Sequence, residues 1–142
     1  MRKIAVLLAT AGALVLTAVS LAGTHSMGWS AKLTAAQEIP KQAVKAPAAN
    51  GAFTASVSGK TLKWKLTFSK LSGPATAAHI HIGGMGTAGN PLVALCGPCK
   101  SGVSGSTPLT AALKAKFAKH LLYVNVHTTK NPAGEIRGQI GS

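Results

Sequence analysis

The segment ATAAHIHIGGMG places His79 and His81 one residue apart. Side chains alternate between the two faces of a β-strand, so this spacing puts both imidazoles on the same face. In the later stretch YVNVHT the valines take one face and His127 takes the other. Two imidazoles at positions i and i+2 can chelate one ion, a third can complete the site, and copper and zinc suit imidazole best. The sequence therefore predicts His79, His81 and His127 as ligands of a Cu or Zn ion.

Three further side chains could extend this candidate metal site. Glu135 in GEIRGQI points away from the aliphatic residues of its strand, and so toward the side predicted for the histidines; it is also spaced to pair with Arg137. Cys96 and Cys99 are candidate thiolate ligands, with a nearby histidine or Met85. The alternative for the histidines is structural, because they could hydrogen-bond the glycine-rich loops that follow their strands and hold no ion.

The cysteine pair has the letters of a thioredoxin active site, Cys96-Gly-Pro-Cys99. In thioredoxins the first cysteine begins a helix, whose dipole lowers the pKa of the thiol. Here the following KSGVSGSTP consists of small and helix-breaking residues and cannot start a helix. We therefore predict a local Cys96–Cys99 disulfide formed in an oxidising compartment, with thiol redox chemistry as the weaker alternative.

Apolar alternation with a period of two dominates the rest of the chain, as in TLKWKLTFSK. Glycine, proline and asparagine separate the alternating segments, which favours an all-β fold, mainly an antiparallel Greek-key-like β-sandwich of about seven strands. One short crossover helix is expected near 108–119, with Thr107 as N-cap and Pro108 at its first position. Besides TLKWKLTFSK, the expected strands lie near 30–35, 51–57, 76–82, 91–95, 121–128 and 134–140.

The amino-terminal segment has the pattern of a Sec-type signal peptide. Arg2 and Lys3 precede a long run without charge, and Ser20 and Ala22 are small residues at the positions that signal peptidase reads. We expect a signal peptide at 1–22, a short linker at 23–30 and one domain at 31–141, in a protein that is periplasmic or secreted. The alternative is an uncleaved membrane anchor; after cleavage no transmembrane span is expected.

The charge balance is strongly basic: fifteen Lys and Arg residues face only Glu38 and Glu135, giving +13, or about +11 without the signal peptide. Such a field attracts anionic partners, here an envelope polymer or lipid surface, although a merely solvated basic surface is the alternative. Nucleic-acid binding is not expected, because the chain is predicted to be exported and aromatic residues make up only 4%. With no aspartate and no phosphate-binding glycine loop, we predict a protein that is not an enzyme.

Taken in order, LTAAQEIP, GPATAAHIHIGGMGTAGNPLVAL and LLYVNVHTTKNPAGEIRGQI resemble the CHRD domain, a module named after chordin. The resemblance implies a mainly antiparallel β-sandwich and an extracellular or periplasmic location, and little about activity. One departure is Lys119-His120, where the family often has glycine. The residues that match the family motifs are Gln37, Glu38, Pro40, His79, His81, Gly83, Asn125, His127, Thr128, Gly134, Glu135, Arg137, Gly138 and Gln139.

Overall fold

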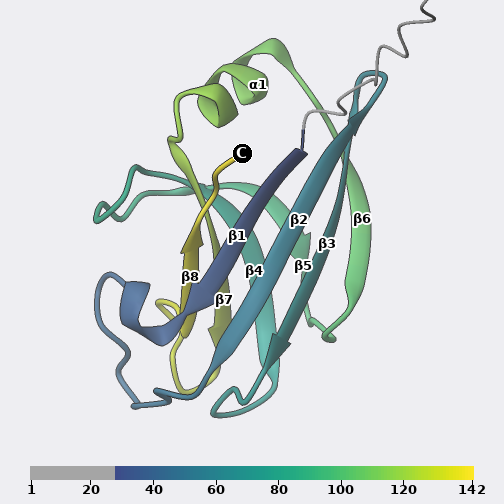
Figure 1. The fold of residues 1–142 in the computed structure, drawn as a ribbon. Helices are drawn as coiled ribbons and strands as arrows, with labels where there is room; N and C mark the ends of the chain where they lie inside the picture. Colours follow the sequence, from purple (N-terminus) through teal and green to yellow (C-terminus); the bar gives the residue numbers. More distant parts are fainter. Residues whose placement is uncertain (1–27) are drawn as a thin grey trace, which may run out of the picture.

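The computed structural model describes residues 28–142, which form eight β-strands, one α-helix and a short 3-10 turn (Figure 1). The expected signal peptide and the first part of the expected linker lie outside these residues. Strand β1 begins at Gly28, so the end of the expected linker belongs to the domain. The elements are β1 (Gly28–Thr34), η1 (Ala35–Gln37), β2 (Asn50–Ser58), β3 (Thr61–Ser69), β4 (Ala75–Ile82), β5 (Pro91–Cys96), β6 (Val103–Pro108), α1 (Ala111–Ala118), β7 (Leu122–Thr128) and β8 (Ile136–Gln139).

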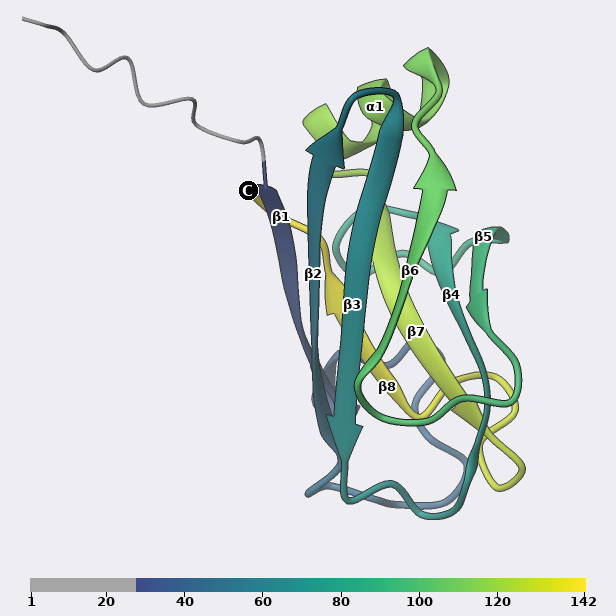
Figure 2. The same ribbon diagram turned by 90° about the vertical axis from the view of Figure 1, so that its right-hand side faces the viewer.

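All strands belong to one antiparallel sheet with the order β5-β4-β7-β8-β1-β2-β3-β6. The sheet curls until its two edge strands, β5 and β6, approach each other, which gives a nearly closed barrel with the flattened shape of a sandwich (Figure 2). The prediction of an all-β antiparallel fold with one helix is confirmed. The sheet contains one strand more than expected.

The additional strand is β6, which the sequence did not reveal because Val103 is the one aliphatic residue among its inward positions. Gly105 faces Trp64 on strand β3, and a Cβ at this position would lie 2.3 Å from the indole ring. The indole therefore fills the space that a side chain of β6 would occupy. Trp64 Nε1 also donates to Thr107 Oγ1 at 3.2 Å, which ties the two strands together. Because Trp64 of β3 supplies the apolar packing here, strand β6 lacks the apolar alternation by which the other strands were predicted.

Helix α1 covers one end of the barrel, above β1 and β7 in Figure 1. Leu113 and Phe117 are its buried residues, and the Phe117 ring lies 4.5 Å from that of Trp29. The predicted N-cap was wrong by one turn: Thr110 caps the helix by accepting from Leu113 N, whereas Pro108 ends strand β6. No helix within residues 28–142 is long and apolar enough to cross a bilayer.

Strand β7 is buried along its whole length, on both of its faces. One face carries aliphatic residues that join the barrel core. The other face carries polar residues, which the loops and the chain before β2 cover. The fully buried aliphatic and aromatic residues of the core are Leu33, Phe53, Leu62, Leu66, Ala78, Ile80, Leu122, Val124, Val126 and Ile136.

The packing of Trp64 on Gly105 can be tested by adding one methyl group. Gly105→Ala should lower the free energy of unfolding by about 1–3 kcal/mol, because the new Cβ overlaps the indole ring. Gly73→Ala is the matched control, since a Cβ at Gly73 meets no atom within 4 Å. Urea denaturation of both variants measures the difference, and equal stabilities would contradict this account of β6.

Candidate metal centre

Strands β4 and β7 bring the three predicted histidines together. His79 lies opposite Asn125, and His127 lies opposite Ala77, so His79 and His127 are diagonal neighbours across the strand pair. His81 is two residues further along β4, on the same face as His79. Ala77 has only a methyl side chain, which leaves room beside the His127 ring. The expectation that the three imidazoles share one side of the sheet is confirmed.

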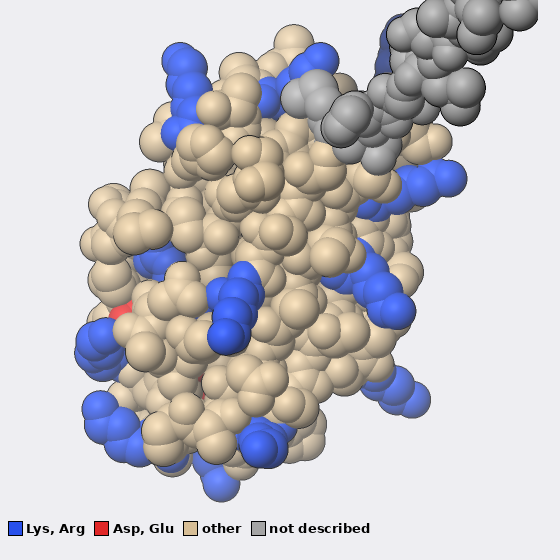
Figure 3. Space-filling view, viewed as in Figure 1, with Lys and Arg blue, Asp and Glu red and all other residues tan. Residues whose placement is uncertain are grey.

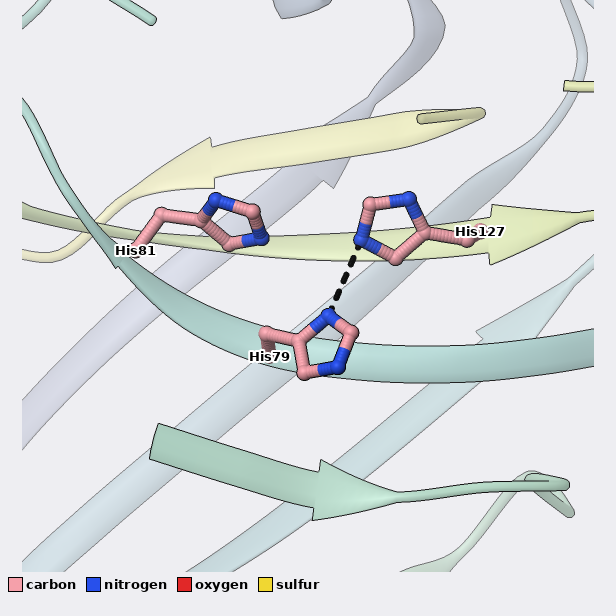
Figure 4. Close-up of side chains that lie close together, drawn as sticks. All are labelled: His79, His81 and His127. Atoms are coloured by element: carbon pink, nitrogen blue, oxygen red, sulfur yellow. Dashed lines mark hydrogen bonds between the residues drawn. The ribbon is translucent and has the colours of Figure 1, made fainter. Parts of the chain in front are cut away.

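The three rings converge on a common point (Figure 4). Their centroids are 5.1 Å apart for His79 and His127, 5.5 Å for His79 and His81, and 5.6 Å for His81 and His127. One nitrogen from each ring lies within 4.8 Å of the others. In a trigonal site with metal–nitrogen bonds near 2.0 Å, the nitrogens are about 3.5 Å apart. Small side-chain rotations would therefore complete the coordination.

Backbone carbonyls fix the tautomers of two of these histidines. His81 Nδ1 lies 2.9 Å from the oxygen of Gly89, and His127 Nδ1 lies 3.0 Å from the oxygen of Pro132. A carbonyl only accepts hydrogen bonds, so each Nδ1 carries the proton and each Nε2 keeps a free electron pair. Metal-ligating histidines are held by this type of second hydrogen bond. The structural role considered for the histidines is therefore present, and it leaves Nε2 available for an ion.

The remaining nitrogens lie next to one another. His127 Nε2 accepts a hydrogen bond from His79 Nδ1 at 3.2 Å, and a bound ion would take the place of this bond. His81 Nε2 is buried and has no hydrogen-bond partner within residues 28–142. An unpaired buried nitrogen costs free energy unless a ligand satisfies it. The arrangement thus contains an electron pair that a cation would use.

Burial keeps these imidazoles neutral. It lowers the pKa of His79 and of His81, and it lowers the pKa of His127 to about 4. The hydrogen bonds to Gly89 and Pro132 oppose this effect at His81 and His127 without reversing it. The neutral imidazole is the form that binds transition metals, so at neutral pH no proton has to leave before an ion binds.

Tyr123 and Arg137 support His81 from the side away from the other histidines. The Tyr123 ring stacks on His81 with centroids 5.0 Å apart, and the Arg137 guanidinium lies 3.5 Å from the centroid of Tyr123. The Tyr123 hydroxyl donates to Gly89 O, the same oxygen that binds His81. Strand alternation places Tyr123 on the histidine face, but nothing in the sequence indicates that it orients a histidine.

Glu135, predicted as an additional ligand, belongs to a different cluster. Its carboxylate accepts from the Ser72 backbone N–H and from the side chains of Ser72, Thr128 and Asn131. Burial alone would raise the pKa of Glu135, but these hydrogen bonds lower it below the ordinary value. The predicted ion pair with Arg137 is wrong, because the Arg137 Nη2 donates to the backbone oxygens of Gly84 and Thr87. Glu135 therefore anchors loops and is not part of the histidine group.

Cys96 and Cys99 form the predicted disulfide, with a sulfur–sulfur distance of 2.08 Å. In this state neither sulfur is a thiolate, so the structure does not support the pair as metal ligands. Cys96 is the last residue of β5, and the next element is strand β6. The chain therefore lacks the helix that activates a thioredoxin cysteine at this position.

Glu38 is a buried carboxyl group close to the histidine face. It is fully inaccessible, and both of its oxygens accept from Asn125 Nδ2 at 3.0 Å. Burial raises the pKa of Glu38 to about 7, although the bond from Asn125 and the positive charge of Arg137 oppose the shift. Gly134 packs against this pair, since a Cβ there would lie 2.6 Å from Glu38 Oε2. Sequence reasoning gave Glu38 no role beyond its match to the family.

The fold and the site define an all-β module with a histidine cluster under its loops. A family model described as the CHRD domain matches residues 29–140, and the chain belongs to this family. The resemblance found from the sequence is thereby confirmed. Searches of curated proteins and of solved structures found no match. The CHRD domain is not known as a catalytic module.

The raised pKa of Glu38 predicts an unusual dependence of stability on pH. The folded chain holds a proton that the unfolded chain releases near pH 4.5, so this contribution is complete below pH 4.5 and is lost as the pH rises through 7. Glu38→Gln stays neutral and should therefore gain about 3 kcal/mol relative to the wild type between pH 4 and pH 8. Urea unfolding at several pH values measures this gain, because the histidine titrations are common to both proteins.

Glu135→Gln is the matched control for this experiment. The pKa of Glu135 is lowered, so its stabilising contribution is present above pH 4.5 and is lost as the pH falls. This variant should therefore lose stability relative to the wild type as the pH rises. A difference between Glu38→Gln and the wild type that does not change with pH would show that Glu38 is not a high-pKa group.

Proposed function

We propose that this chain is an exported, non-catalytic CHRD module that binds one copper or zinc ion through His79, His81 and His127. The observation that carries the proposal is the convergence of three neutral imidazoles, two of which are held by carbonyls at Nδ1 so that their Nε2 atoms point toward the other rings. Imidazole is a good ligand for both ions. The residues come from two hydrogen-bonded strands, so their positions are set before any ion arrives.

Three protein nitrogens leave part of the coordination sphere to another ligand. A site with three histidines and an open position accepts water or a small anion as its fourth ligand. His79 is the most accessible of the three residues, whereas His81 and His127 are 8% and 9% exposed. We expect the ion to enter on the side of His79, where the neighbouring residue of β5 is Ala94.

Calorimetric titration of the mature protein with Cu(II) and with Zn(II) tests the metal site. The wild type should bind one ion per chain, and replacement of all three histidines by alanine should abolish this binding. His79→Ala alone should weaken it strongly while the carbonyl bonds of the other two rings remain. His79 is the variant least able to perturb folding, because it is the most accessible of the three.

His120→Asn is the matched control, since His120 is exposed on the turn between α1 and β7 and asparagine tolerates its positive φ of 53°. It should bind metal as the wild type does. If the triple variant is folded by circular dichroism and still gives the wild-type binding heat, the three histidines are not the metal site.

Export is supported by the charged start, the long apolar run and the small residues before Gly23. The disulfide is of the kind that oxidising compartments allow. Expression of the full-length chain should therefore yield a periplasmic or secreted protein whose first residue is Gly23. Amino-terminal sequencing of fractionated cells measures this, and a chain that keeps residues 1–22 in the membrane fraction would support the anchor instead.

A further inference from the structure

The outer surface of strands β1, β2, β3 and β6 is a sheet face that neither the helix nor the long loops cover (Figures 1 and 2). Its inward residues fill the barrel core, and its outward residues are short hydroxyl side chains and lysines. We call it the lysine–hydroxyl face. Its members are Ser30, Lys32, Thr54, Ser56, Lys63, Lys65, Thr67, Ser104 and Ser106.

Strand register places a hydroxyl on each side of two of these lysines. Lys65 lies opposite Thr54 on β2 and opposite Ser104 on β6. Lys63 has the same surroundings one step along β3, with Ser56 and Ser106 as its neighbours. The two lysines are about 7 Å apart along the strand, and each hydroxyl row is about 5 Å away. The face therefore repeats one pattern of a cation between two hydroxyl groups.

The positive charge of this face is not neutralised by the protein itself. Glu38 and Glu135 are the only acidic residues of the chain, and both side chains are fully buried. The surface of residues 28–142 consequently exposes no acidic side chain, and Figure 3 shows lysines projecting with almost no red between them. An anionic partner would meet attraction without local repulsion.

The side chains of the lysine–hydroxyl face favour an anionic polymer over a lipid bilayer as its binding partner. The exposed large apolar residues are Val44, Met85, Leu92 and Leu121, and none of them lies on this face. Interfacial membrane binding of the amphipathic type uses apolar side chains that enter the lipid in addition to cations. Strand β3 instead presents a shallow depression of about 250 Å³ that Thr54, Ser56, Lys63 and Lys65 line together with Ala55 and Trp64.

We propose that the lysine–hydroxyl face binds a linear acidic polysaccharide. The lysines would pair with carboxylates along the polymer, and the serine and threonine hydroxyls would exchange hydrogen bonds with the sugar hydroxyls between them. The short side chains of β2 and β6 let an extended chain lie close to the sheet. This face is made by β1, β2, β3 and β6, whereas the histidines come from β4 and β7, so the proposal does not depend on metal binding.

Binding of the mature protein to alginate, a linear polyuronate, tests the proposal in buffer that contains a chelator. The combined variant Lys32→Gln, Lys63→Gln and Lys65→Gln should lose at least about tenfold in affinity, because it removes the three cations of the face. The control Lys45→Gln, Lys100→Gln and Lys130→Gln removes the same charge from exposed loop positions and should lose only about twofold. Affinity should fall as salt rises.

The hydroxyl groups are tested by Ser104→Ala with Ser106→Ala, which leaves the charge unchanged. Alginate binding should weaken more in this variant than binding to inorganic polyphosphate, which accepts hydrogen bonds from serine but has no sugar hydroxyls to donate in return. Equal losses in the two lysine variants would show attraction to the whole surface and overturn the proposal. Wild-type binding to phosphatidylglycerol vesicles that is as tight as binding to alginate would overturn it in favour of a membrane.

Discussion

The structure depends on burying a polar face of its own sheet while hydrogen-bonding most of the polar groups on it. Strand β7 is enclosed on both sides, so its outward side chains lie beneath loops instead of in water. A buried polar group is costly unless it is hydrogen-bonded. Asn125 binds Glu38, Thr128 binds Glu135, and Arg137 binds two backbone oxygens of the loop after β4. These residues also belong to the motifs that the chain shares with the CHRD domain. Their hydrogen bonds give those motif positions a role in folding.

The same burial determines the chemistry of the histidines. A histidine on an open sheet would rotate freely and titrate near its ordinary pKa. Under the loops, His81 and His127 donate to carbonyls and keep their pKa values low, and Tyr123 holds His81 in place by stacking. The loops therefore convert a pair of ordinary strand positions into oriented, neutral ligands. The disulfide after β5 closes a separate loop at the sheet edge and takes no part in this arrangement.

Charge is divided between the inside and the outside of the molecule. The two carboxyl groups lie inside, where Glu135 is held by hydrogen bonds and burial raises the pKa of Glu38 to about 7. The lysines lie outside on strands and loops that keep them in water. Because opposite charges are separated in this way, surface ion pairs cannot offset the basic character that the composition indicates. The histidine cluster and the lysine–hydroxyl face are consequently two distinct surfaces with different chemistry.

The sequence by itself determined the strand faces, because alternation at a period of two is a local property of the backbone. It therefore predicted the antiparallel all-β fold and the shared side of His79, His81 and His127, and the short spacing of Cys96 and Cys99 predicted the disulfide. It could not place β6, where Trp64 packs over Gly105 and replaces the apolar signal. Nor could it show that the polar face is covered, that Glu135 binds Ser72, or that Gly89 and Pro132 orient the imidazoles. Those contacts join residues on different strands and loops, and only the closed sheet decides which of them meet.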